Sequence, residues 1–193
     1  MTYLDAINAI IGTCGYVPLA SLDEEHAFKD AAVSLFDRTL RSELTKGWYF
    51  NRVYVSLKPN EQGSVFVTHD VIDFITAVPG YYKSGNQIRR IGDPLGPITT
   101  VVSGRLVYSL QFDECPDLFQ AWVLASARVQ FQTVYDGDST KTRQLAAEAA
   151  AAWSAFHTSE IVGTRANFLD SNARLAEVRN SFGRQITRMS TRK

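Results

Sequence analysis

The chain has 193 residues, 45% of them hydrophobic, and equal numbers of basic and acidic side chains, 20 of each. These values suit one sizeable globular domain and exclude a chain that is basic over its whole length, as many nucleic-acid-binding domains are. No run of about 18 apolar residues is present, so we expect no membrane span and synthesis in a cytoplasm. Cys14 and Cys115 cannot build a disulfide framework, and we expect two buried free thiols.

The charges are distributed unevenly along the chain. Residues 1–51 contain seven acidic and four basic side chains. Residues 164–193 contain two acidic residues, Asp170 and Glu177, and seven basic ones: Arg165, Arg174, Arg179, Arg184, Arg188, Arg192 and Lys193. An acidic beginning and a basic end indicate that the two ends contact different surfaces.

Residues 1–51 predict two helices. A capping box of Thr2 and Asp5 precedes an apolar stripe, so we expect a helix over residues 2–14 that ends at Gly15, with Pro18 after it. A second capping box, Ser21 with Glu24, predicts a helix over residues 21–46. That helix stops at Gly47 and is followed by an aromatic cluster with Trp48, Phe50 and then Asn51.

From residue 52 to about residue 112 the hydrophobic period is close to two, which is typical of strands. We expect strands over residues 53–57, 66–68, 72–77, 87–91, 99–102 and 105–110, and a tight hairpin turn at Ser103-Gly104. The period returns to that of a helix near Pro116, a favoured first-turn residue. Residues 52–112 are therefore predicted to be a small antiparallel β module inserted into a helical frame.

The second half of the frame is predicted to contain helices over residues 116–135 and 139–159, with Trp48 and Trp122 both buried. Beyond Gly163 the chain is polar and rich in arginine, with few apolar residues. The expected fold class is α+β, mainly α: a four-helix frame (residues 1–51 and 113–163), the β module between helices 2 and 3, and an extended basic C-terminal arm, residues 164–193.

Motifs for catalysis or cofactor binding are missing from the sequence. His26, His69 and His157 have no partner at metal-ligand spacing, and no nucleophile elbow, P-loop or dinucleotide fingerprint occurs. The carboxylates that could form the catalytic pair of a glycoside hydrolase are Asp70, Asp73 and Asp93. Tyr81-Tyr82-Lys83 and Arg89-Arg90 fit either a nucleic-acid stacking platform or, more often, an exposed strand face. We expect no metal, no cofactor and no enzyme activity.

Two patches of the sequence resemble one protein family. The first patch comprises Ala6-Ile7-Asn8-Ala9-Ile10-Ile11-Gly12, Gly15-Tyr16-Val17-Pro18, Leu22-Asp23 and Lys46-Gly47-Trp48-Tyr49-Phe50-Asn51. The second is Cys115-Pro116 with Phe119-Gln120-Ala121-Trp122. Both are similar to the tail tubular protein A family of short-tailed bacteriophages, except that Lys46 stands where that family usually has arginine. The resemblance covers the helical frame and is weak in the β module and the C-terminal arm.

The resemblance implies a structural protein of the virion tail, made in the host bacterial cytoplasm. Family members form a ring, usually of twelve subunits, that joins the portal protein to the tail nozzle, a protein of the tail tubular protein B type, and surrounds the channel through which DNA leaves. We expect the basic residues of the C-terminal arm to make assembly contacts. Two alternatives stay open: a tail-associated hydrolase of polysaccharide or cell wall, and a DNA-binding module that uses the arginine-rich C-terminus.

Overall fold

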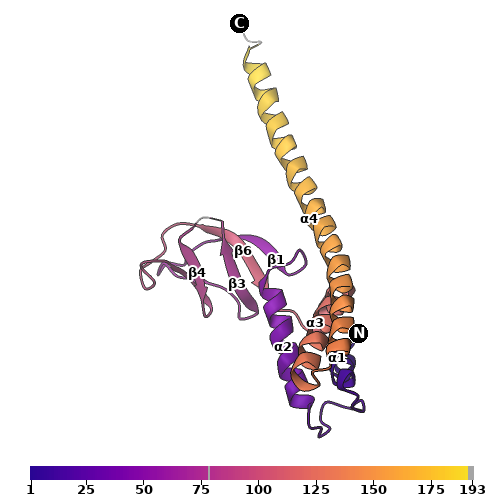
Figure 1. Cartoon of the computed structure of the whole chain (residues 1–193). Coiled ribbons are helices and arrows are strands. Elements are labelled where there is room, and N and C mark those ends of the chain that lie inside the picture. The colour runs from indigo at the N-terminus through magenta and orange to yellow at the C-terminus, as the bar shows by residue number, and fades with distance from the viewer. Residues whose placement is uncertain (78, 191–193) are drawn as a thin grey trace. The chain divides into compact units, whose positions relative to one another are not determined.

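A computed structural model describes residues 1–77 and 79–190, with side chains described as far as Thr164. The chain, drawn in Figure 1, divides into two compact units, residues 1–156 and residues 157–193. The helices are α1 (Tyr3–Ile11), α2 (Lys29–Thr45), α3 (Asp117–Tyr135) and α4 (Ser139–Ser190), with short 3-10 turns η1 (Gly12–Cys14) and η2 (Phe112–Glu114).

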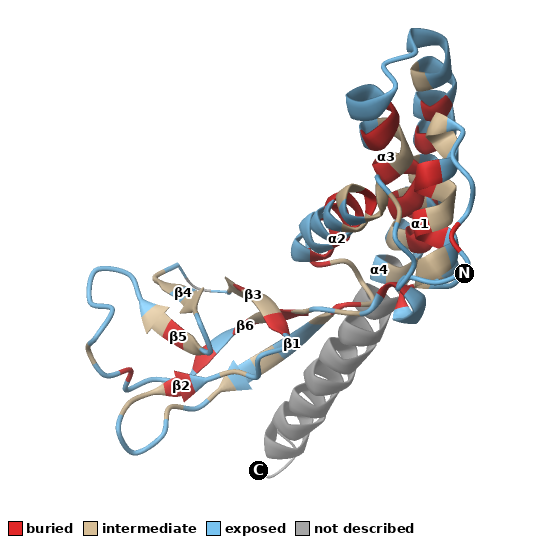
Figure 2. Ribbon diagram, turned by 90° about the horizontal axis from the view of Figure 1, so that it is seen from below, coloured by how far each residue is buried: buried red, intermediate tan, exposed pale blue. Residues whose placement is uncertain are grey.

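Helix α1 begins as the sequence predicts. The Thr2 hydroxyl accepts a hydrogen bond from the Asp5 amide at 3.2 Å, and the Asp5 carboxylate accepts one from the Thr2 amide at 3.0 Å. This reciprocal cap satisfies two amides that the helix itself leaves unpaired. Apolar residues of the four helices then form one core, whose buried members, red in Figure 2, include Ile7, Ile10, Phe36, Phe119, Phe131 and Phe156.

The second helix starts later than predicted, because residues 21–28 form turns and α2 begins at Lys29. The Glu24 carboxylate accepts a hydrogen bond from the Ala20 amide at 2.8 Å, and His26 Nδ1 accepts one from the Phe28 amide at 3.1 Å. Such local bonds from side chain to backbone compete with the helical pattern. The turns also bring the Phe28 ring to within 5.5 Å of the Tyr135 ring on α3, between ring centroids.

The β module is confirmed between α2 and α3, as two small antiparallel sheets. Strands β1 (Arg52–Leu57), β6 (Val102–Tyr108) and β3 (Val71–Thr76) form one sheet in that order. Strands β2 (Val65–Phe66), β5 (Gln87–Arg90) and β4 (Tyr81–Ser84) form the other. The module has its own apolar core, built from Val65, Val71, Phe74, Ile88, Ile98, Val102 and Leu106.

The predicted hairpin turn at Ser103-Gly104 is wrong, as is the separate strand over residues 99–102. Both residues lie within β6, which runs unbroken to Tyr108. Gly104 is there because the Phe74 ring lies across it: a Cβ at this position would approach Phe74 Cζ to 2.5 Å. Glycine in a strand often marks such a close approach rather than a turn.

The fourth helix does not end near residue 159, and residues 164–190 are helical instead of extended. No proline follows Pro116 in the sequence, and arginine and alanine, both good helix formers, make up nine of the thirty residues after Gly163. An isolated glycine inside a helix costs about 1 kcal/mol, which such neighbours offset. The predicted boundary at Gly163 therefore does not terminate the helix.

Candidate functional site

The junction between the frame and the β module contains the residues that the sequence singled out. Gly47 follows α2 with a backbone φ of +72°, the left-handed conformation that glycine adopts readily. A Cβ at Gly47 would lie 3.0 Å from Cγ2 of Val107, a residue of β6. The chain therefore turns out of α2 directly against the central strand of the first sheet.

Asn51 holds this junction together. Its side chain is 2% exposed, and its Nδ2 donates to the carbonyl oxygens of Leu44 on α2 and Tyr108 on β6, both at 2.9 Å. Its Oδ1 accepts from the Trp48 amide at 2.8 Å. A buried amide with every bond satisfied is specific for one geometry, so Asn51 fixes the start of the β module relative to the end of α2.

Trp48 and Trp122 both bond to Glu43, a residue that no sequence motif indicated. The Trp48 indole donates to the Glu43 carbonyl oxygen at 2.8 Å, and the Trp122 indole donates to a Glu43 carboxylate oxygen at 3.3 Å. Lys46 completes the group with its Nζ 2.7 Å from the same carboxylate. Both tryptophans are only partly buried, so the prediction that they are buried is wrong. Their indole N–H groups point toward the partly exposed ion pair of Glu43 and Lys46.

The remaining motif residues organise the ends of the helices. Gly15 closes η1 with a φ of +80°, and Pro116 caps the start of α3. Pro18 is exposed but precedes buried Leu19, whose backbone N–H and C=O both bond to the Asn8 side chain, at 2.8 and 3.0 Å. Asn8 therefore fixes the path of the loop, a role that its helical spacing alone did not indicate.

A hollow lies on the outer face of the β1-β6-β3 sheet. It has a volume of about 600 Å³ and is lined by Tyr54, Val55, Ser56, Ile75, Thr76, Ala77, Ser103, Gly104 and Arg105. The strand register places Tyr54 and Ile75 on either side of Arg105. Neither Tyr54 nor Arg105 was predicted as a functional residue, because short alternating strands do not indicate which face another element covers.

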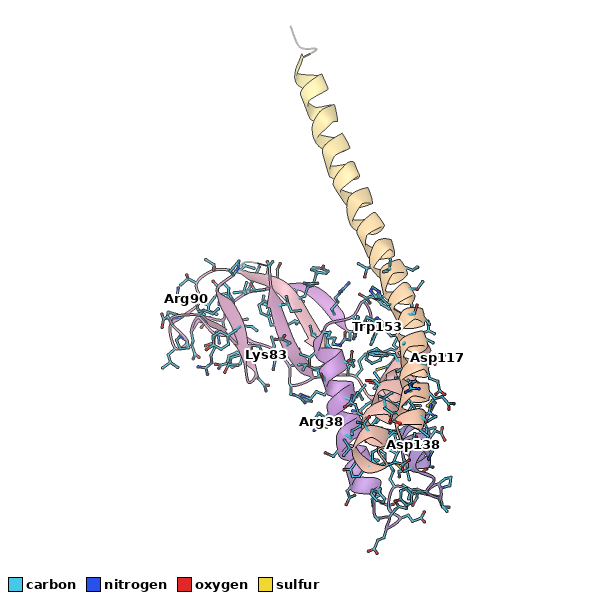
Figure 3. All side chains as sticks on the ribbon, in the orientation of Figure 1. Arg38, Lys83, Arg90, Asp117, Asp138 and Trp153 are labelled. Atoms are coloured by element: carbon cyan, nitrogen blue, oxygen red, sulfur yellow. The ribbon has the colours of Figure 1, made fainter. Side chains whose placement is uncertain are left out.

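The β4–β5 hairpin brings together the aromatic and basic residues noted in the sequence. Tyr82 lies opposite Arg89 and Tyr81 opposite Arg90, so these residues occupy neighbouring strands, as both interpretations require. Arg90 pairs with Asp93 at 2.8 Å, and Arg89 donates to the Pro94 carbonyl oxygen at 3.3 Å. Figure 3 labels Lys83 and Arg90 on this hairpin. Because both guanidinium groups already have partners, the hairpin is a weak candidate for a nucleic-acid platform.

The three candidate catalytic carboxylates are engaged in local structure. Asp93 is held by Arg90, and Asp73 accepts a hydrogen bond from the Phe74 amide at 2.7 Å. A hydrogen bond from Thr68 holds the pKa of Asp70 below its ordinary value, opposite to the shift that a general acid needs. Among the residues that the structure describes, no group of three histidine, cysteine or acidic side chains could hold a metal ion.

The basic residues predicted to make assembly contacts lie outside the described side chains. The structure describes only the backbone, within α4, of Arg165, Arg174, Arg179, Arg184 and Arg188. The last two, Arg192 and Lys193, lie outside the described residues. Within residues 1–77 and 79–190, none of the helices is both long and apolar enough to cross a membrane.

Comparison with known proteins identifies the family. The chain matches the family model described as "Tail tubular protein" over residues 4–177, which span the helical frame and the β module. No curated protein matches the chain. The resemblance carried by the frame motifs is therefore confirmed, and the chain belongs to the tail tubular protein family, as a structural component of a phage virion tail that assembles with other virion proteins.

Proposed function

We propose that this chain is the head-to-tail adaptor of a short-tailed phage. Twelve copies would form a ring that joins the portal protein to a tail nozzle of the tail tubular protein B type and surrounds the DNA ejection channel. The observation that carries the proposal is the family match over residues 4–177, since it includes both the frame and the inserted β module.

The exposed apolar side chains of the first unit support an assembly role. Val17 is 78% exposed and Leu95 is 88% exposed, one on the frame and one on the β module. Others of this kind are Tyr54, Phe66, Ile91 and Val134. Single exposed apolar residues are ordinary, but their occurrence on both parts of the unit fits a subunit with several neighbours.

The junction supports a mechanical role. The Asn51 hydrogen bonds tie the β module to the end of α2. The Glu43 group ties the end of α2 to α3. A rigid junction lets a subunit set the spacing between the proteins that it joins. The basic residues 165–193 are proposed to contact the portal or a neighbouring subunit, while DNA passes through the channel without sequence-specific binding, because tight binding there would impede ejection.

We further propose that the protein is not an enzyme. The engagement of Asp70, Asp73 and Asp93 in local bonds supports this, since paired catalytic carboxylates need free oxygens and opposed pKa shifts. An assay of the purified protein on host capsule and cell-wall polysaccharide is expected to show no turnover. Turnover that is lost in an Asp73→Asn variant would establish the hydrolase alternative.

The test of the adaptor proposal is reconstitution. The purified chain is mixed with its portal protein, then with the nozzle protein, and the products are sized and imaged by electron microscopy. We expect a closed ring attached to the portal that is required for the nozzle to bind. A chain that stays monomeric with the portal, while the nozzle binds without it, would overturn the proposal.

A further inference from the structure

We propose that the hollow on the outer face of the β1-β6-β3 sheet is a subunit contact that receives the acidic segment 22–25 of a neighbouring copy. Arg105 would bind the carboxylates of Asp23 and Glu25. The inference rests on the proposed ring and names one interface within it.

Arg105 is the first reason to expect an anion in the hollow. It is partly buried and lies over the Tyr54 ring, with its guanidinium carbon 5.8 Å from the ring centroid. Among the described residues it has neither a carboxylate partner nor a hydrogen-bond acceptor. A guanidinium presents five N–H donors in a planar fork that matches a carboxylate, and here that fork is open.

The neighbouring lining residues add polar and apolar contacts. The Ser56 and Ser103 hydroxyl oxygens lie 3.0 Å apart, and their mutual hydrogen bond uses one of two hydroxyl hydrogens. The second hydrogen is available to a further acceptor. Tyr54 is 75% exposed, so most of its ring is accessible to a partner. Aromatic and arginine side chains around a hollow are typical of the centres of protein interfaces.

The segment 22–25 has the complementary chemistry. Asp23, Glu24 and Glu25 are all exposed, and Leu22 is exposed beside them. Glu24 is used by the Ala20 amide, but the carboxylates of Asp23 and Glu25 have no ion-pair partner among the described side chains. The segment therefore presents two unpaired carboxylates next to an apolar side chain.

The charge of the larger parts agrees with this pairing. Residues 1–51, which carry the segment, contain seven acidic and four basic side chains. The β module, residues 52–112, contains four acidic side chains and six basic ones: Arg52, Lys58, Lys83, Arg89, Arg90 and Arg105. Complementary charge favours an encounter between the β module of one copy and the acidic segment of another.

The segment cannot come from the same copy. It precedes α2, whereas the β module follows α2, so the two lie at opposite ends of that helix (Figure 1). Seventeen helical residues place these ends roughly 25 Å apart at 1.5 Å per residue. A contact between two different surfaces of neighbouring copies is heterologous, and its repetition closes a ring when the rotation from one copy to the next brings the last copy to the first.

Charge exchange on the full chain tests the contact. Self-association is measured by native mass spectrometry, with and without portal protein. Arg105→Glu is expected to weaken association at least tenfold, and Asp23→Lys with Glu25→Lys is expected to do the same. The triple variant, which carries Arg105→Glu with both lysine substitutions, should recover most of the loss because the ion pairs are restored in reverse. Lys58→Glu and Glu61→Lys are charge-matched controls on the same module and should change association less than twofold.

A crosslink reports the contact directly. In the Arg105→Lys variant, a zero-length carbodiimide should join position 105 to Asp23 or Glu25 in a covalent dimer, identified by peptide mapping. Thermal unfolding of each variant separates loss of contact from loss of fold. Two results together would overturn this inference and leave the adaptor function standing. The Arg105→Glu variant would form rings on the portal as well as the parent chain does, and the Arg105→Lys variant would give no crosslink. Absence of any ring in the parent chain would overturn both.

Discussion

Asn51 and Tyr108, 57 positions apart in the sequence, are joined by two hydrogen bonds: Tyr108 N donates to the Asn51 carbonyl oxygen at 2.8 Å, and Asn51 Nδ2 donates to the Tyr108 carbonyl oxygen at 2.9 Å. Asn51→Ala removes the second of these bonds. It also leaves the Leu44 carbonyl oxygen and the Trp48 amide without their hydrogen-bond partner. We expect a loss of about 2–4 kcal/mol in the free energy of unfolding, measured by urea denaturation.

Asn60→Ala is the matched control for this prediction. Its side chain also accepts from two backbone amides, of Gln62 and Ser64, but it lies in an exposed turn. Water replaces those bonds, so the loss should stay below about 1 kcal/mol. Equal losses in the two variants would contradict the role given to Asn51.

Gly47→Ala should destabilise the protein by about 1–3 kcal/mol, and Gly47→Val by more. The added Cβ meets Val107 at 3.0 Å, and the backbone φ of +72° disfavours any side chain. Gly137→Ala separates the two effects, because Gly137 has the same φ but no described atom within 4 Å of its added Cβ. Thermal unfolding should show a larger loss at Gly47. If the two alanine variants lose the same stability, the contact with Val107 contributes nothing.

Cys115 should resist alkylation in the folded protein. Burial raises the pKa of its thiol to about 12, with Glu114 and Asp113 adding to the effect, so the reactive thiolate is scarce at pH 8. Cys14 is partly exposed, not buried as the sequence predicts, so iodoacetamide should label it and reach Cys115 only in urea. Rapid labelling of both thiols in buffer would show that Cys115 is accessible.

The same shift predicts a pH dependence of stability. A thiol whose folded pKa is raised contributes stability that is fully present below its unfolded pKa and is lost as pH rises toward the folded value. The Cys115 contribution should therefore decline from about pH 9 to about pH 12. Cys115→Ala should make the loss of stability over this range smaller, and denaturation curves across the range would detect the difference. The raised pKa of Tyr3 leaves a remaining loss in the variant.

Truncation after Gly163 should leave the first unit folded, because Phe156 is the last buried core residue among the side chains that the structure describes. The shortened chain is expected to unfold at nearly the same temperature as the parent but to fail to join the portal, since it lacks the seven basic residues of the C-terminal arm. Normal assembly and normal DNA ejection with the shortened chain would show that the arm is dispensable.

The sequence predicts structure correctly where a residue type itself favours one backbone conformation. The Thr2 capping box, the positive φ at Gly47 and the helix after Pro116 follow from local chemistry, and so does the change of period around the β module. Ser103-Gly104 misled because the same dipeptide suits a turn and a strand crossed by an aromatic ring, and Phe74 is distant in sequence. The helix predicted over residues 21–28 was wrong because Glu24, the residue expected to cap that helix, instead accepts a hydrogen bond from the Ala20 amide.

The candidate assembly surface was harder to predict than the fold. Tyr54 and Arg105 are 51 positions apart, and only the pairing of β1 with β6 brings them together. The sequence of a six-residue strand such as β1 does not indicate which of its two faces other elements of the fold leave uncovered. Glu43 was missed for a similar reason, since its partner Trp122 lies on another helix.

The adaptor account is tested most directly by electron microscopy of the complete virion at a resolution that identifies side chains. We predict twelve copies of this chain in a closed ring between the portal and the nozzle, around the DNA channel. Density for this chain in a fibre, inside the head, or in a ring that does not touch the portal would contradict the account.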